Sequence, residues 1–135
     1  MNYKQMLQKH NLKVTPQRLE IVNLLFKIGH MNIDNLYKFL KRKFPSLSLA
    51  TVYKNIYAMS EKNFLSEVKI PHEKNVYELT KKEHSHIVCT KCHTIKDIDL
   101  DISMILNQAK MISDYHLNES SIVFNGLCPK CYPSN

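Results

Sequence analysis

The chain has 135 residues, enough for one ordinary domain or two small ones. Hydrophobic residues make up 44% and charged residues 23%, which is typical of globular proteins rather than of disordered or fibrous ones. No apolar run approaches the roughly 20 residues that a membrane span requires, and the N-terminal stretch MNYKQMLQKHNL lacks the apolar segment of a signal peptide. We therefore expect a cytoplasmic protein without a membrane partner, whose four cysteines are metal ligands before they are disulfides.

Positive charge is distributed unevenly along the chain. Residues 1–76 contain 13 Lys/Arg against 5 Asp/Glu, a net charge of +8, whereas residues 77–135 contain 6 against 7, a net charge of −1. A basic part joined to a near-neutral part indicates a polyanionic partner for the basic part, most simply nucleic acid. A lysine-rich surface that is merely solvated is the alternative.

The first part of the chain is predicted to be helical. A short helix is expected over residues 3–10. A second helix is predicted to start at Thr15, an N-cap residue, followed by Pro16 at the first helical position. Apolar residues recur at helical spacing after this start, and Gly29 ends the helix.

Two more helices and two short strands complete the first part. Apolar spacing predicts one helix from Ile33 that stops before Pro45, and another from Leu49. Runs rich in β-forming residues follow over residues 65–70 and 76–79. This order is that of a winged helix-turn-helix, in which the last helix enters the major groove and the strands form the wing.

The helix from Leu49 carries side chains that suit contacts to phosphate and to base edges. Tyr53 also lies on the apolar stripe of this helix, so a position in the core is its alternative role. Lys13 and Arg18 are placed to reach phosphate or the minor groove, or they are ordinary surface charges. The candidate DNA-binding residues are Lys13, Arg18, Thr51, Tyr53, Lys54 and Asn55.

The second part is predicted to be a smaller α+β module. Short strands are expected over residues 84–89, 94–100 and 120–127, with a helix between the last two that includes Ile102 and Ala109. The module has little apolar mass for its length. Modules of this kind commonly need a metal ion or a partner subunit to be stable.

Two Cys-x-x-Cys pairs in this module predict a zinc site. Cys89 and Cys92 form the first pair, and Cys128 and Cys131 form the second. Two such pairs match a closed tetrahedral site of four thiolates, which are soft ligands suited to zinc. Buried reduced cysteines, or an oxidised pair in an oxidising compartment, are the alternatives.

Two histidines precede the first cysteine pair, in the stretch EHSHIVCTKC. Side chains alternate between the faces of a strand, so His84 and His86 share a face that excludes Cys89. Two separate metal sites are therefore favoured. A single site with two Cys and two His would leave Cys128 and Cys131 unexplained.

The sequence resembles the ferric uptake regulator family over nearly its whole length. The matching stretches are KVTPQR, FPSLSLATVYKNI, EHSHIVCTKC and GLCPKC. The resemblance implies a metal-dependent repressor that binds double-stranded operator DNA as a homodimer and has no small-molecule substrate. It also implies an α+β fold, with a winged-helix DNA-binding domain over residues 1–76 and a dimerisation and metal-binding domain with structural zinc over residues 77–135.

The resemblance also assigns roles to individual residues. On the family pattern, Tyr53 and Lys54 lie where the recognition helix contacts DNA, and Lys13 lies where a minor-groove contact is made. The structural zinc ligands correspond to Cys89, Cys92, Cys128 and Cys131. The ligands of a regulatory iron or manganese site correspond to His30, Glu78, His84, His86 and Asp97. Spacing alone would not pick out His30, Glu78 or Asp97.

Asp97 favours the peroxide-sensing branch of the family, because the iron-sensing branch tends to carry Glu at this position. In the peroxide-sensing branch a ligand histidine is oxidised when Fe(II) is bound, and the matching residues here are His30 and His84. An iron-sensing or other metal-sensing regulator of the family is the alternative. Many iron-sensing members have a third metal site with His and Asp at the positions that Glu83 and Ser85 occupy here. That third site is therefore not expected to be complete.

A zinc hydrolase or deaminase is the remote alternative from a different class. The chain lacks an HExxH motif, a Gly-rich phosphate loop and a nucleophile elbow. The basic helical part would also have no role in such an enzyme. We therefore expect a regulator and not an enzyme.

Overall fold

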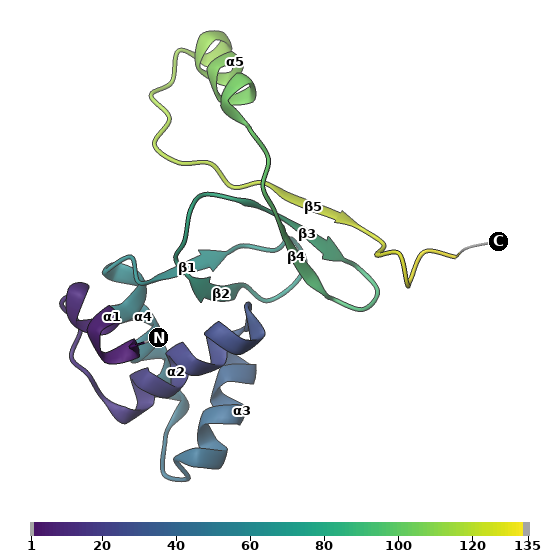
Figure 1. The fold of residues 1–135 in the computed structure, drawn as a ribbon. Helices are drawn as coiled ribbons and strands as arrows, with labels where there is room; N and C mark the ends of the chain where they lie inside the picture. The colour runs from purple at the N-terminus through teal and green to yellow at the C-terminus, as the bar shows by residue number, and fades with distance from the viewer. Residues whose placement is uncertain (1, 134–135) are drawn as a thin grey trace. The chain divides into compact units, whose positions relative to one another are not determined.

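The computed structural model describes residues 2–133, so residues 1 and 134–135, at the ends of the two predicted domains, lie outside the described residues. The chain divides into two compact units, residues 1–81 and 82–135. The boundary was predicted five positions earlier, after Val76. It lies after Lys81 because strand β2 (Val76–Leu79) pairs with β1 (Leu65–Val68) and so belongs with the helices (Figure 1).

Four helices precede the β1–β2 hairpin in the first unit, namely α1 (Tyr3–Lys9), α2 (Pro16–Ile28), α3 (Ile33–Lys43) and α4 (Leu49–Glu61). Each begins at a side chain that accepts a hydrogen bond from the backbone N–H three residues later, and these caps are Asn2, Thr15, Asn32 and Ser48. Gly29 ends α2 with a φ of 97°, a conformation that glycine adopts without strain. The predicted start and end of α2 are therefore confirmed.

The helices of the first unit enclose one hydrophobic core. Leu7, Leu36 and Met59, from three different helices, are completely buried. Burying each such side chain contributes about 1.5–3 kcal/mol to the free energy of folding. The β1–β2 hairpin follows α4 directly, with Leu65 opposite Leu79, and β1 ends at Val68 rather than at residue 70 because pairing stops there. Helices followed by a hairpin are the order predicted for a winged helix-turn-helix.

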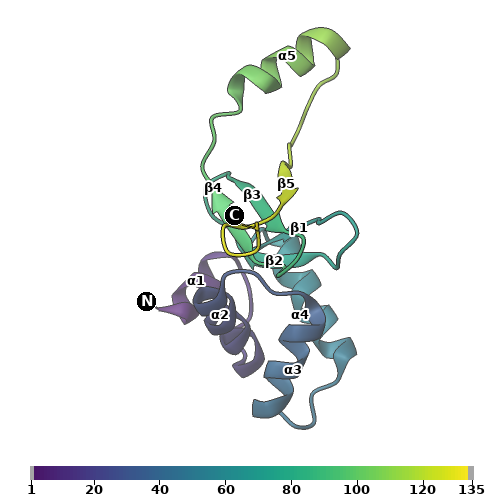
Figure 2. The same ribbon diagram turned by 90° about the vertical axis from the view of Figure 1, so that its right-hand side faces the viewer.

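The second unit is built on a three-stranded sheet. β3 (Ser85–Cys89) lies in the centre, antiparallel to β4 (Ile95–Ile98) and parallel to β5 (Val123–Gly126). Helix α5 (Ser103–Ser113) lies in the connection between β4 and β5 (Figures 1 and 2). The predicted strands were one to several residues too long, because backbone pairing covers only these shorter segments.

Apolar side chains of the second unit remain largely exposed. None of the described residues of α5 is buried, and Met104 and Ile112 are 83% and 77% exposed. Val88 and Cys89 are the buried hydrophobic residues among those described in this unit. In the part of the chain that the structure describes, none of the helices combines the length and the apolar character of a membrane span.

Candidate metal centres and nucleic-acid interface

The four cysteines meet in the second unit. Because β5 runs parallel to β3 with Gly126 opposite Cys89, the turn after β5 begins beside the end of β3. The sulfur atoms of Cys89, Cys92, Cys128 and Cys131 all lie within 4.8 Å of one another. Cys92 Sγ and Cys128 Sγ are 3.8 Å apart, and metal–sulfur bonds of about 2.3 Å in a tetrahedron place sulfurs about 3.8 Å apart. The cluster therefore fits a four-thiolate zinc ion.

Hydrogen bonds prepare this cluster for a cation. The backbone N–H groups of Cys92 and Cys128 donate to Cys89 Sγ over 3.5 and 3.4 Å and lower the pKa of Cys89 to about 6. Hydrogen bonding with the Cys128 thiol raises the pKa of Cys131 to about 12. The pKa values of Cys89 and Cys131 are therefore shifted in opposite directions, and a divalent cation on the cluster would favour the thiolate form that binds it.

A histidine and a carboxylate meet within the first unit. The turn between α2 and α3 pairs with β2 through a bridge from Met31 to Tyr77. This bridge brings His30 Nε2 within 2.8 Å of Glu78 Oε2. Glu78 is buried on the same face of β2 as Val76. A buried carboxylate needs a partner, and His30 lies next to Glu78.

Two histidines and an aspartate meet within the second unit. His86 on β3 is the register partner of Asp97 on β4, and His86 Nε2 lies 3.4 Å from Asp97 Oδ1. His84 precedes β3, which begins at Ser85, yet its Nε2 lies 3.5 Å from the same oxygen. The two imidazole rings are 4.5 Å apart. The histidines and the cysteines of the unit therefore form separate clusters, as alternation along a strand predicts.

Helix α4 offers an exposed polar and aromatic face. Val52 and Ile56 point into the core, whereas Tyr53 and Tyr57 are 51% and 67% exposed. Tyr53, whose alternative role is a position partly in the core, therefore has about half of its surface exposed. Lys54 is exposed beside them, and Thr51 lies in the first turn, where its backbone N–H donates to the Ser48 cap.

Arg18 joins two other candidates to each other. Its Nε donates to Asn55 Oδ1 on α4 over 3.0 Å, and its Nη1 donates to the backbone carbonyl of Lys13 over 3.1 Å. No local sequence pattern predicts the contact between Arg18 and Asn55, because these residues are 37 positions apart.

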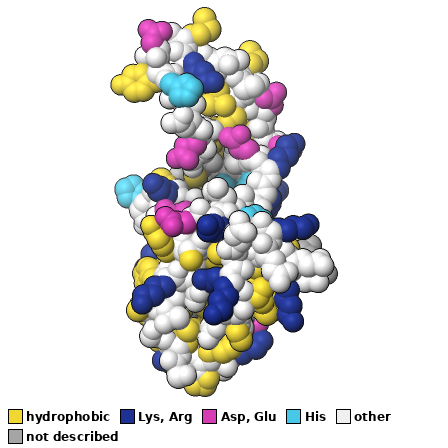
Figure 3. Space-filling view, turned by 90° about the vertical axis from the view of Figure 1, so that its left-hand side faces the viewer, with side chains coloured by type: hydrophobic (Ala, Val, Ile, Leu, Met, Phe, Trp, Pro, Cys, Tyr) yellow, Lys and Arg dark blue, Asp and Glu magenta, His cyan; other side chains and the backbone are white. Residues whose placement is uncertain are grey.

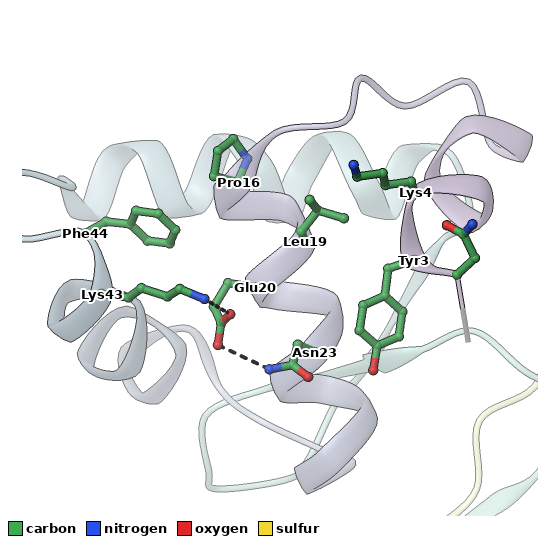
Figure 4. Close-up of a pocket in the computed structure, with 9 residues that line it drawn as sticks. Tyr3, Lys4, Pro16, Leu19, Glu20, Asn23, Lys43 and Phe44 are labelled. Atoms are coloured by element: carbon green, nitrogen blue, oxygen red, sulfur yellow. Dashed lines mark hydrogen bonds and ion pairs between the residues drawn. The ribbon is translucent and has the colours of Figure 1, made fainter.

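The surface of the first unit is basic. Residues 1–81 hold 14 Lys/Arg against 6 Asp/Glu, a net charge of +8. Several Lys and Arg side chains lie among hydrophobic and other side chains on the face of this unit in Figure 3. A cleft of about 750 Å³ beside α2 contains a 2.8 Å ion pair between Lys43 and Glu20 (Figure 4). Asn23 donates to the same carboxylate over 3.4 Å. The cleft holds a satisfied ion pair rather than a metal-ligating or nucleophilic group.

Comparison with known proteins agrees with this arrangement. The chain is 37% identical to the peroxide stress regulator of Campylobacter jejuni, whose structure superposes with a TM-score of 0.72 and coverage of 97% of this chain and 100% of that one. It is 28% identical to the ferric uptake regulation protein of Synechococcus elongatus, over 95% of this chain and 91% of that protein. It is 27% identical to the peroxide-responsive repressor PerR of Staphylococcus epidermidis, over 93% of this chain and 85% of that protein.

The family model described as the ferric uptake regulator family matches residues 9–125. This match covers most of both compact units. The chain therefore belongs to the ferric uptake regulator family of metal-responsive transcriptional regulators, which are not enzymes.

Proposed function

We propose that the protein is a peroxide-responsive repressor that binds operator DNA as a homodimer in the cytoplasm. The observation that carries the proposal is the division of nitrogen and oxygen donors between the two units. His30 and Glu78 are paired in the first unit, and His84, His86 and Asp97 are grouped in the second. A metal ion that uses both groups makes the DNA-binding unit responsive to metal.

The first unit is proposed to bind DNA through α4. Its net charge of +8 attracts a polyanion. The exposed side chains of Tyr53 and Lys54, with half-buried Thr51 in the first turn, suit a helix that lies in the major groove. Exposed Lys13 suits a contact beside it. The β1–β2 hairpin serves as the wing.

The second unit is proposed to hold two protomers together. Its helix α5 presents Met104, Ile105, Met111 and Ile112 to solvent, with exposed fractions of 60% or more. A second copy of the chain covers such a face symmetrically. In the proposal, zinc on the four cysteines stabilises this thin module, so the ion has a structural role.

The regulatory ligands are proposed to be His30 and Glu78 together with His84, His86 and Asp97. Mixed imidazole and carboxylate donors suit Fe(II) or Mn(II). Either ion would supply the positive charge that joins the ligands of the first unit to those of the second. Iron would also supply the electrons that reduce peroxide. Because the ligands come from both units, bound metal stabilises the arrangement of the units for which its affinity is highest. The stabilisation equals the difference between the metal's binding free energies in the two arrangements. Half-sites on DNA are recognised only when the two recognition helices are correctly spaced.

The peroxide response rests on Asp97 and on the named relatives. An aspartate at this position favours the peroxide-sensing branch, and the Campylobacter jejuni and Staphylococcus epidermidis relatives are named as peroxide regulators. His30 or His84 is proposed to gain one oxygen atom from peroxide at a ring carbon. The hydrogen of that carbon moves to a ring nitrogen, and the second peroxide oxygen leaves as water. Iron sensing is the second candidate, because a relative named as a ferric uptake regulation protein is 28% identical, close to the 27% of the Staphylococcus epidermidis repressor.

Peroxide treatment of metal-loaded protein tests the proposal. Zinc-containing protein is loaded with Fe(II) or with Mn(II), treated with peroxide, and followed by operator gel shift and peptide mass spectrometry. We expect the Fe(II) form to gain one oxygen on the peptide of His30 or His84 and to release DNA, and the Mn(II) form to stay bound. An Fe(II) form that remains unmodified and bound to DNA would identify an iron sensor instead.

A further inference from the structure

We propose that Arg18 is a positioning residue for DNA recognition rather than a direct DNA contact. Its guanidinium ties the segment that contains Lys13 to helix α4 through Asn55. The inference rests on the proposed function of the first unit as a DNA-binding module.

The backbone of Arg18 is fixed before its side chain acts. Arg18 lies in the first turn of α2, where its N–H donates to the Thr15 hydroxyl over 3.2 Å. From this anchored position, Nε reaches Asn55 Oδ1 at 3.0 Å and Nη1 reaches the Lys13 carbonyl at 3.1 Å. One planar group therefore connects the start of α2, the segment before it, and the fourth helix.

Only arginine can make this connection. Its guanidinium carries five N–H donors in a fixed plane and stays charged at any physiological pH. Lysine has the same charge but presents it as a compact point on a flexible stem, so it does not set the spacing of two acceptors. The two acceptors here, an amide oxygen and a backbone carbonyl, are neutral, so the role of Arg18 depends on geometry more than on ion pairing.

Asn55 is placed to hold Arg18 rather than to read a base. It is half-buried next to Ile56 of the core face, whereas Lys54 and Tyr57 are exposed. Asparagine recognises adenine by using its amide oxygen and its amide nitrogen together. The oxygen of Asn55 already accepts from Arg18, so one of its two acceptor positions is used inside the protein in this arrangement.

The connection matters because Lys13 and α4 must fit the same duplex. If Arg18 stops joining them, each element still carries its charges, but their spacing is no longer fixed. Binding that depends on charge alone then persists, while binding that depends on simultaneous placement in the grooves weakens. A positioning role therefore predicts a loss of specific affinity with little change in salt dependence.

The two arginines of the chain, Arg18 and Arg42, provide a matched pair of variants. Arg42 is exposed on α3, so Arg42→Lys is the control for Arg18→Lys. Zinc- and Mn(II)-loaded proteins are tested on a duplex that the parent protein selects from a random pool, and on a scrambled duplex. We expect Arg18→Lys to bind the selected duplex about tenfold more weakly, with an unchanged salt slope, and to bind the scrambled duplex like the parent.

A double-mutant cycle with Asn55→Ala completes the test. If Arg18 acts through Asn55, the double variant binds no more weakly than either single variant. Additive losses, or full retention of binding in Arg18→Lys, would make Arg18 an independent phosphate contact and overturn the inference. If the melting temperature of Arg18→Lys fell in proportion to its loss of DNA binding, the contact would stabilise the fold in general. This result would also overturn the inference. A parent protein that selects no duplex would contradict the DNA-binding function itself, which is a separate failure.

Discussion

The two compact units differ in how much apolar surface they bury. The first unit has a continuous core that includes Leu36, Leu40 and Val52, all completely buried. The second unit buries Val88 and Cys89 among its described apolar residues and leaves the apolar side of α5 in solvent. The first unit is therefore stabilised mainly by its own core. The second buries little apolar surface of its own, which agrees with the proposed zinc ion at the cysteines and the proposed second copy at the helix.

The units also differ in charge. The first carries a net charge of +8, whereas residues 82–135 hold 5 Lys/Arg against 6 Asp/Glu, a net charge of −1. Charge repulsion between copies is therefore weak in the second unit, which suits self-association. The basic unit suits a polyanion, so each unit has the composition for a different partner.

Cys128→Ser should have the largest effect, and it should be confined to the second unit. Zinc binding supplies about 10–16 kcal/mol of apparent free energy in zinc-finger peptides, far more than the small core of this unit provides. We expect loss of zinc, loss of the dimer and rapid hydrogen exchange over β3–β5, with protected amides in α2–α4. A fully folded dimer with unchanged melting would show that the cluster is not structural.

Leu36→Ala is the matched change in the first unit. Leu36 is fully buried, and removing such a side chain costs about 2–5 kcal/mol. We expect faster hydrogen exchange over the helices α2–α4 and a lower melting temperature, while zinc content and the dimer remain. Loss of zinc in this variant would mean that the two units do not fold independently.

Ile112→Glu should weaken the dimer by about a hundredfold or more, because a charge is placed on an apolar face that a partner covers. Ile112 is 77% exposed in the single chain, so the unit itself should stay folded. Asn107→Glu introduces the same charge on the polar side of α5 and is the control. Sedimentation velocity over a range of concentrations measures both. Equal behaviour of the two variants would exclude this face as the dimer contact.

Lys54→Ala should weaken operator binding by roughly tenfold, because it removes one contact to a base edge that is worth about 1–3 kcal/mol. Lys54 is exposed on α4, so folding should be unaffected. Fluorescence anisotropy on operator and scrambled duplexes gives the two affinities. A larger loss on operator indicates base reading, whereas equal losses with a salt slope reduced by about one indicate a phosphate contact.

Lys43→Met should have the smallest effect, below about 1 kcal/mol in the free energy of unfolding. Lys43 and Glu20 form an ion pair at 2.8 Å, but the side chain of Lys43 is 61% exposed and water screens it. Urea unfolding should therefore give the parent midpoint within a few tenths of a molar unit. A large shift would show that the cleft in Figure 4 contributes to stability more than a surface ion pair does.

Local signals in the sequence predicted the helices well. Thr15 with Pro16, and Gly29, each place a helix end where the structure has it, because caps and glycine act on their own neighbours. Strand lengths were less accurate, since a strand ends where its partner ends. The parallel pairing of β5 with β3 depends on a crossover through α5, which no local pattern specifies.

The candidate sites divide in the same way. The cysteine pairs are recognisable from spacing, because two residues between ligands let both sulfurs reach one ion. Nothing near His30 in the sequence points to Glu78, since a bridge between Met31 and Tyr77 brings them together. The contact from Arg18 to Asn55 could not be predicted either, because it depends on where the fold places the start of α2 relative to α4.

The most direct measurement of the central proposal is the Mn(II) stoichiometry of zinc-loaded protein and of variants from each unit. Calorimetric titration should show one Mn(II) per protomer in the parent, and loss of this binding both in His30→Ala of the first unit and in His86→Ala of the second. His116→Ala, at an exposed histidine outside both histidine clusters, should bind like the parent. Zinc content should be unchanged in all variants. Unchanged Mn(II) affinity in His30→Ala would contradict a regulatory ion shared between the two units.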